Sequence, residues 1–350
     1  MTDDPIHPRD ALLHAGEAAP ALPVCDHYSG VEARMRRSLA LQAELGPVFD
    51  VTLDCEDGAP VGGEAEHAHM AAEFVMSAAN RFGRVGARVH PVDHPSFAAD
   101  VATLVGRAGS RLAYLMCPKP NGLADVQRAC AEIDHQLRVH GNGNGNGNGN
   151  GNGNGHPRPV PVHVLIETHG ALREVEAIAA HPRVQSLSFG LMDFVAAHRG
   201  AIPASAMGAE GQFTHPLVRR AKLAIAAACH GFGKTPSHCV VTEFSDLGAI
   251  AEAATRASRE FGYTRMWSIH PDQIEPIVEA FAPGAAEVDQ AIEIIVAAQD
   301  ARWAPTRHRD ALHDRASYRY FWQVLERAHR TGQPLPAEVQ LRFFGPAPAI

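Results

Sequence analysis

The sequence predicts an α/β fold of the (β/α)8 TIM-barrel type with a C-terminal helical extension. Eight short apolar runs have the length and composition of strands, and most are followed by a stretch with helical periodicity. No glycine-rich phosphate loop follows the first run, where residues 24–30 read Val-Cys-Asp-His-Tyr-Ser-Gly. An open, doubly wound sheet would usually carry such a loop, so the pattern favours a closed barrel.

The elements alternate in the order that a barrel requires. The expected strands are Ala21–Cys25, Val48–Asp54, Gly86–Pro91, Leu112–Pro118, Val162–Glu167, Ser186–Leu191, His238–Phe244 and Thr264–Ile269. The expected helices between them are Glu64–Ala79, Leu123–Val139, Ala171–Ala180, Leu217–His230 and Leu247–Phe261.

Three further segments complete the predicted organisation. Residues 1–19 form an N-terminal arm, residues 20–283 the barrel, and residues 284–350 the extension, with helices expected over Ile274–Phe281, Val288–Ala301 and His313–Arg330. We expect the extension to be too short for a core of its own and to pack on the barrel or on a neighbouring subunit. The Gly-Asn alternation at 141–155 is expected to be a disordered insert, and tolerated repeat expansion explains it better than a functional tether.

Composition narrows the class of partner. The chain is 45% hydrophobic and has a net charge of −8, which argues against a nucleic-acid or anionic-membrane partner that binds through bulk charge. It has no 18-residue apolar run and no N-terminal secretion signal, so we expect a cytoplasmic protein. The six cysteines include no C-x-x-C pair, which is typical of reduced, buried thiols.

Two carboxylates mark the ends of neighbouring expected strands. Glu167 ends the run Val-His-Val-Leu-Ile, and Asp193 follows Ser-Leu-Ser-Phe-Gly-Leu-Met. Acids on successive strand ends can supply oxygen ligands to a hard cation such as Mg²⁺, with water and substrate completing its coordination. The same acids could instead cap the helices that follow, and the pair alone leaves both interpretations open.

In a barrel, residues from several strand ends meet at one rim, which is the usual source of catalytic groups in this fold. The acids expected there are Asp54, Glu56, Asp57, Glu167 and Asp193, and the basic residues are Arg88, His90, Lys119 and His270. So many acids require a cation or mutual ion pairs. Lys119 could bind substrate or pair with Glu56 or Asp57, and His270 could simply start a helix.

Six short motifs, in order, resemble the citrate lyase β-subunit and malyl-CoA lyase group of the HpcH/HpaI aldolase superfamily. The resemblance covers roughly residues 20–283 and rests on Leu53-Asp-Cys-Glu-Asp, Arg88-Val, Pro118-Lys119, Leu165-Ile-Glu-Thr168, Phe189-Gly-x-x-Asp193 and Ile269-His-Pro-x-Gln273. It implies an oligomeric, Mg²⁺-dependent (β/α)8 barrel (Mn²⁺ could substitute) that cleaves or forms carbon–carbon bonds in 3-hydroxyacyl-CoA thioesters.

The resemblance also assigns roles. Glu167 and Asp193 would hold the metal, Arg88 would bind substrate as a catalytic arginine, and Glu56 and Asp57 would be catalytic acids beside the metal. A general base must take the hydroxyl proton in a retro-aldol cleavage. We expect neighbouring acids to raise the pKa of Asp57 and so favour it, with Glu56 and metal-bound water as alternatives.

Two other functions compete with this one. The first is the same chemistry on a free, pyruvate-type acid without CoA. Two departures from the family favour it: Arg265-Met266 stands where the family usually has Gly-Lys, and the C-terminal tail lacks the Asp-Gly stretch of many members. The second is a non-catalytic barrel that binds a ligand, against which the retained acids argue. In each case the partner is a small molecule, with acyl-CoA in the leading hypothesis, and the expected assembly is a homo-oligomer, a trimer or hexamer.

Overall fold

The computed structural model describes residues 5–13, 21–141, 158–243 and 245–346. The chain divides into two compact units, one formed by Pro20–Ile277 and the other by Met1–Ala19 together with Val278–Ile350. The predicted Gly-Asn insert falls on residues outside the described ranges, except for Gly141, which ends a helix.

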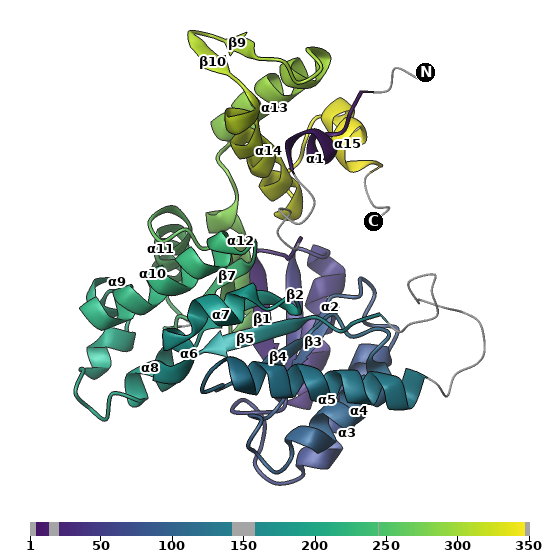
Figure 1. Ribbon diagram of the computed structural model, residues 1–350, viewed down its shortest axis with the longest axis vertical. Helices are drawn as coiled ribbons and strands as arrows, with labels where there is room; N and C mark the ends of the chain where they lie inside the picture. The colour runs from purple at the N-terminus through teal and green to yellow at the C-terminus, as the bar shows by residue number, and fades with distance from the viewer. Residues whose placement is uncertain (1–4, 14–20, 142–157, 244, 347–350) are drawn as a thin grey trace. The chain divides into compact units, whose positions relative to one another are not determined.

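The first unit is a closed barrel of eight parallel strands in sequence order, in which β1 pairs with both β2 and β8 (Figure 1). The strands are β1 (Cys25–Ser29), β2 (Phe49–Asp54), β3 (Val85–Arg88), β4 (Leu115–Cys117), β5 (Val162–Ile166), β6 (Val184–Phe189), β7 (Thr235–His238) and β8 (Arg265–Ser268). The predicted (β/α)8 fold is confirmed.

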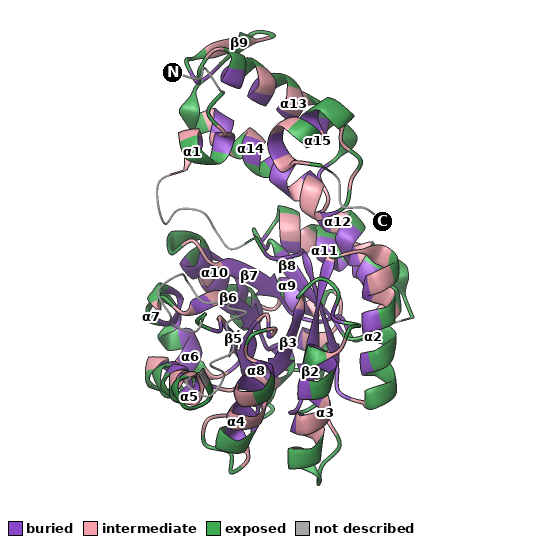
Figure 2. Ribbon diagram, turned by 90° about the vertical axis from the view of Figure 1, so that its right-hand side faces the viewer, coloured by how far each residue is buried: buried purple, intermediate pink, exposed green. Residues whose placement is uncertain are grey.

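Helices surround the barrel. They are α2 (Glu32–Leu45), α3 (Glu64–Met76), α4 (Phe97–Ala108), α5 (Leu123–Gly141), α6 (His169–Arg173), α7 (Val175–Ala180), α8 (Leu191–Ala196), α9 (Gly211–Thr214), α10 (Pro216–Gly231), α11 (Leu247–Arg259) and α12 (Ile274–Phe281), with short 3-10 helices η1 (Ala204–Met207) and η2 (Pro271–Gln273). The strands are almost wholly buried, and the helices bury one face (Figure 2). This is the pattern of a parallel sheet covered by helices.

A buried charge cluster lies inside the barrel near the strand starts. Arg265 at the start of β8 is fully buried, with Nη1 2.6 Å from Asp50 Oδ2 and Nη2 3.0 Å from Asp26 Oδ2. Asp26 also accepts hydrogen bonds from Thr52 at 2.7 Å and Tyr114 at 3.0 Å. Opposite charges and hydroxyl donors therefore compensate one another where water is excluded.

Two strand predictions were wrong in position. The first strand was expected at 21–25 but is Cys25–Ser29, because the inward-facing Asp26 breaks the apolar pattern. The seventh was expected at 238–244 but is Thr235–His238, although it contains a proline. The apolar residues that follow it are buried without belonging to the strand.

The second unit has a hydrophobic core of its own, contrary to expectation. It contains α1 (Pro8–Leu12), α13 (Ala285–Asp300), the hairpin of β9 (Thr306–His308) and β10 (Ala311–His313), α14 (Arg315–Arg330) and α15 (Ala337–Phe344). Leu12 of the N-terminal segment packs with Ile294, Trp322 and Phe343 in one buried cluster. Arg9 reinforces this packing through an ion pair with Glu326 at 2.7 Å. Leu12 is the one N-terminal member of this cluster of buried residues, and the extension supplies the other members.

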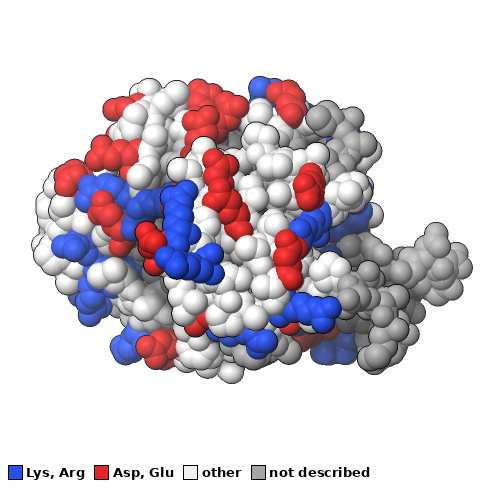
Figure 3. Space-filling view, turned by 90° about the horizontal axis from the view of Figure 1, so that it is seen from above, with Lys and Arg blue, Asp and Glu red and all other residues white. Residues whose placement is uncertain are grey.

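The surface carries both signs of charge. On the face drawn in Figure 3, Lys and Arg side chains lie among Asp and Glu side chains. Across the described part of the chain, no helix combines the length and the apolar character needed to cross a membrane.

Candidate active site

The carboxyl ends of β2 and β3 meet through Asp54 and Arg88. Nε of Arg88 donates to Asp54 Oδ1 at 2.7 Å and Nη2 donates to Oδ2 at 2.5 Å, so the planar guanidinium is held by two parallel bonds. Asp54 also accepts the backbone N–H groups of Glu56 and Gly58, at 3.0 and 2.8 Å. It thereby fixes both the arginine and the loop after β2.

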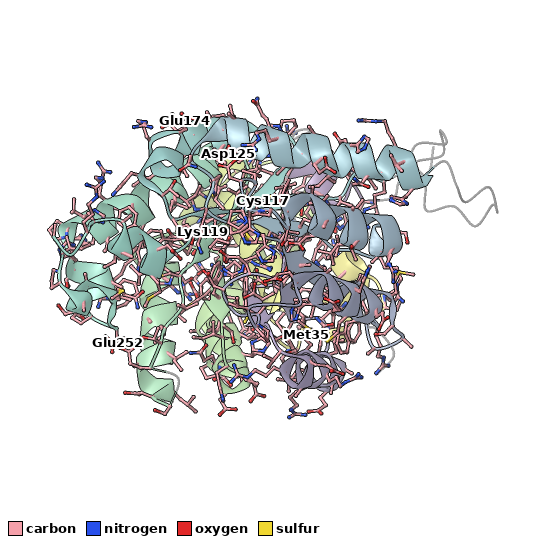
Figure 4. All side chains as sticks on the ribbon, turned by 90° about the horizontal axis from the view of Figure 1, so that it is seen from below. Met35, Cys117, Lys119, Asp125, Glu174 and Glu252 are labelled. Atoms are coloured by element: carbon pink, nitrogen blue, oxygen red, sulfur yellow. The ribbon has the colours of Figure 1, made fainter. Side chains whose placement is uncertain are left out.

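Glu56, Asp57 and Lys119 form an ion-pair group next to the arginine. Nη1 of Arg88 lies 3.0 Å from Glu56 Oε2. Nζ of Lys119 lies 2.5 Å from Glu56 Oε1, 2.7 Å from Asp57 Oδ2 and 3.9 Å from an oxygen of Asp193. Figure 4 shows Lys119 inside the ring of helices around the barrel. Of the two uses predicted for Lys119, the structure places it in ion pairs with both acids.

Glu167, at the end of β5, is 2% exposed. Its Oε1 accepts the backbone N–H of Lys119 at 2.7 Å, and Lys119 has a left-handed φ of 49° that points this N–H inward. A Cβ at Gly190 would lie 2.2 Å from Glu167 Oε2, so the carboxylate occupies space that only a glycine leaves free. The position of Glu167 is thus set by two neighbouring backbone segments.

Burial and the nearby Asp193 carboxylate raise the pKa of Glu167 to about 8. A buried carboxylate next to a second acid is stabilised by added positive charge, and a bound cation would supply that charge. Within the described residues, no group of three or more His, Cys, Asp or Glu side chains is arranged to enclose a metal. The metal role of Glu167 and Asp193 stays a prediction; two carboxylates would leave positions for water and substrate on a bound cation.

The expected pKa of Asp57 was wrong in direction. Burial alone would raise it, but the hydrogen bond and charge of Lys119 outweigh burial, and the pKa of Asp57 is lowered. The pKa of Glu56 is raised, chiefly by burial, against the opposing effects of Arg88 and Lys119. Of the two acids, Glu56 is the one with the higher affinity for a proton.

The two histidines expected at the rim have local partners. Nδ1 of His90 lies 2.6 Å from Asp100 Oδ2 on helix α4, outside the barrel. The side chain of His270 accepts the backbone N–H of Asp272 at 3.3 Å and caps η2, as the helix-start interpretation predicted.

A small apolar cluster, here called the floor, lies inside the barrel and is formed by residues that belong to β1, β4, β5 and β8 or follow β7. It consists of Tyr28, Met116, Leu165, Val240 and Trp267. Leu165 precedes Glu167 by two residues on the same face of the chain, which places it roughly 6–7 Å deeper. Sequence reasoning did not place Tyr28 and Trp267 in this cluster, because the first strand was expected too early and an inward aromatic residue has no sequence signal of its own.

Comparison with known proteins gives the same family that the six sequence motifs predicted. The chain matches the family model described as HpcH/HpaI aldolase/citrate lyase over residues 45–271. It is 30% identical to the L-malyl-CoA/beta-methylmalyl-CoA lyase of Cereibacter sphaeroides over 266 residues, covering 72% of this chain and 77% of that protein.

Two solved structures extend the comparison. A citrate lyase from Burkholderia xenovorans is 52% identical, with a TM-score of 0.80, and the match covers 97% of this chain and 100% of that one. The CitE protein of Mycobacterium tuberculosis, in complex with magnesium, acetoacetate and coenzyme A, has a TM-score of 0.64 at 20% identity, covering 88% of this chain and 99% of that one. This second likeness shows the shared fold alone.

A closed (β/α)8 barrel with buried acids and a clamped arginine at its carboxyl rim defines a barrel enzyme of the metal-assisted type. The chain belongs to the HpcH/HpaI aldolase/citrate lyase family. The resemblance that its six motifs predicted is confirmed, and so is the enzyme class, carbon–carbon lyase, at the level of this family.

Proposed function

We propose that the chain is a Mg²⁺-dependent carbon–carbon lyase that cleaves a 3-hydroxyacyl-CoA or a related hydroxy acid by a retro-aldol or Claisen-type reaction. The observation that carries the proposal is the buried Glu167 carboxylate, which is held by the Lys119 N–H at 2.7 Å and faces Asp193. The relatives support it, since they include malyl-CoA lyases and a citrate lyase.

Glu167 and Asp193 would hold the metal. When bound there, Mg²⁺ would act as a Lewis acid and as a template that orients the substrate's oxygens. Mn²⁺ takes the same oxygen ligands and would substitute for it. Gly190 keeps the Glu167 carboxylate free of side-chain crowding, and Lys119 offsets the charge of the neighbouring acids.

Arg88 would bind the substrate's carboxylate or developing enolate oxygen. Two of the five N–H donors of the guanidinium are used on Asp54, and Nη1 lies 3.0 Å from Glu56 Oε2 in an ion pair without a hydrogen bond, so three donors remain for substrate. Its fixed orientation places positive charge where negative charge grows in the transition state, without reorganisation at the moment of reaction.

Glu56 is a better general base than Asp57. The base must accept a proton from the substrate hydroxyl, and the pKa of Glu56 is raised whereas that of Asp57 is lowered. Lys119 contacts both acids, so its ammonium group would remain paired with Asp57 when Glu56 takes up the proton. Its second role, substrate binding, then depends on release of one of these ion pairs.

The argument for a CoA-independent reaction is weakened by the position of Arg265 and Met266. Both side chains are fully buried within β8, and Arg265 pairs with Asp26 and Asp50 near the strand starts. A change there lies away from the rim and does not alter recognition of a thioester. We therefore retain the acyl-CoA substrate, in a cytoplasmic homo-oligomer (trimer or hexamer).

Calorimetric titration of Mg²⁺ into the purified protein tests the metal site directly. Glu167→Gln should lower Mg²⁺ affinity at least about tenfold and abolish turnover of malyl-CoA. Glu252→Gln is the matched control, because Glu252 is exposed on α11 at the periphery of the barrel (Figure 4). Unchanged Mg²⁺ affinity in Glu167→Gln would overturn the assignment. Absence of Mg²⁺ binding in the unaltered protein would favour a non-catalytic barrel.

A further inference from the structure

Two aromatic residues in the floor carry polar atoms without partners. Tyr28 and Trp267 are each 7% exposed, and their rings lie 4.4 Å apart between centroids. Within the described part of the chain, neither Tyr28 Oη nor Trp267 Nε1 has a hydrogen-bond partner. The other three members of the floor, Met116, Leu165 and Val240, have no polar side-chain atom to offer.

Tyr114 provides a contrast in the same barrel. Its hydroxyl is as deeply buried, yet it donates to Asp26 at 3.0 Å and shares a hydrogen bond with Thr52 at 2.6 Å. Buried hydroxyl and indole groups normally find partners, and one left unpaired lowers the stability of the folded protein. The Tyr114 hydroxyl is thus satisfied, whereas the Tyr28 hydroxyl and the Trp267 indole N–H have no partner among the described residues.

The floor donors lie next to the substrate-binding arginine. The guanidinium carbon of Arg88 is 5.4 Å from the centre of the Tyr28 ring. Tyr28 is opposite Thr52 on β2, two residues before Asp54, which clamps the arginine. Tyr28 therefore lies directly beside the arginine that would bind an anionic substrate, and Trp267 lies against the ring of Tyr28.

Both groups can donate under working conditions. The indole N–H is a donor only. Burial raises the pKa of Tyr28 well above its usual value, so its hydroxyl keeps the proton that it would donate. A carboxylate or enolate oxygen can accept from both groups, and the positive charge of Arg88 favours such an oxygen.

We infer that Tyr28 Oη and Trp267 Nε1 are substrate-binding donors, which hydrogen-bond an oxygen of the small oxo-acid part of the substrate. The inference rests on the proposed function and adds to it the residues that would recognise the oxo-acid part of the substrate. In the unliganded protein these donors are unsatisfied, and substrate supplies the missing acceptor. Their loss should therefore change stability and binding in opposite directions.

Tyr28→Phe tests this with two measurements on the full-length protein. Without ligand, removal of an unsatisfied hydroxyl should leave the melting temperature unchanged or raise it by about 2–4 °C. In calorimetric titrations with Mg²⁺ plus pyruvate, and separately Mg²⁺ plus acetoacetate, the same variant should bind the acid about tenfold or more weakly, the usual effect of losing a hydrogen bond to a charged group.

Tyr114→Phe is the matched control, since it removes a satisfied hydroxyl. It should lower the melting temperature without ligand and leave acid affinity nearly unchanged. Trp267→Phe gives an independent variant for the second donor, and it too should weaken binding of the acid about tenfold.

The outcomes separate two kinds of failure. If the unaltered protein binds neither acid with Mg²⁺, the proposed function fails. If it binds them and both Tyr28→Phe and Trp267→Phe bind equally well, the inference alone is overturned. A large loss of stability in unliganded Tyr28→Phe would also overturn it, because the hydroxyl would then have an internal partner.

Discussion

Asp54 holds Arg88 with both carboxylate oxygens while it accepts two backbone N–H groups from the loop that follows it. The orientation of the arginine and the path of the loop bearing Glu56 and Asp57 are therefore set by one side chain. Because both partners are buried, the pair has little competition from water, and loss of either would leave an uncompensated charge.

Arg88→Lys should lower kcat/KM at least about a hundredfold, because an ammonium group cannot reproduce the two parallel bonds or their fixed plane. It should also destabilise the fold, by roughly 1–3 kcal/mol, through incomplete pairing of Asp54. Steady-state kinetics and urea denaturation measure the two effects. The control Arg36→Lys alters an exposed pair with Glu32 and should change neither by much. Full activity in Arg88→Lys would refute a role for the guanidinium plane.

Glu56→Gln and Asp57→Asn should differ strongly in turnover. Glu56 is the proposed base, so its replacement should lower kcat by about 10²–10⁴. Asp57 is held ionised by Lys119, and its replacement should have a much smaller effect. The comparison requires kcat for both variants with Mg²⁺ at saturation. The opposite ranking would return the role to Asp57.

Gly190→Ala should weaken Mg²⁺ binding without unfolding the protein. The added Cβ would lie 2.2 Å from Glu167 Oε2 and must displace the carboxylate, while the φ of −87° is one that alanine adopts easily. Gly231→Ala at the end of α10 is the control, since a Cβ there meets nothing within 4 Å. Calorimetry with Mg²⁺ should show a loss of affinity only at position 190, and equal affinities would mean that Glu167 is not a ligand.

Lys222→Met should stabilise the protein at neutral pH. Lys222 is fully buried against Phe213, and burial lowers its pKa from 10.5 to about 8. For a base with a lowered folded pKa, the destabilisation is complete below pH 8 and is relieved as the pH rises toward 10.5. Its size is on the order of 3 kcal/mol.

Urea denaturation at several pH values measures this effect. The advantage of Lys222→Met should be largest at pH 7 and should shrink between pH 8 and 10.5. A variant less stable than the unaltered protein at pH 7 would mean that the hydrogen bond from Lys222 to Gln212, at 2.9 Å, outweighs the burial of the charge.

The sequence was sufficient for the barrel and for most of the rim. Strands β2, β5 and β6 are almost wholly buried and contain enough apolar residues to be recognised, and acids follow where the chain leaves the core, so Glu167 and Asp193 could be located from these runs. The position of strand β1 could not be predicted in the same way, because the residues that face inward from it are Asp26 and Tyr28. An aspartate is compatible with a barrel interior only if a partner such as Arg265 arrives from more than 200 residues away, and a local pattern does not contain that partner.

The chemistry of individual acids was equally hard to predict. Asp57 lies beside Glu56 in the sequence, which argues for a raised pKa, but in three dimensions its nearest charge is Lys119. Length alone predicts no core for the extension, yet its own residues supply thirteen of the fourteen members of the buried cluster, and Leu12 adds the last. The first error came from treating a sequence neighbour as the nearest spatial neighbour, and the second from judging a core by chain length.

The packing of Leu12 against Ile294, Trp322 and Phe343 also sets an order of events during synthesis on the ribosome. The barrel strands pair with their predecessors as they emerge, and the barrel can close once β8 is available. Helix α1 precedes the barrel in the sequence and its partners follow the barrel, so α1 has nothing to dock on while the barrel is translated. Its apolar side chains are then open to chaperones for longer than those of any barrel strand.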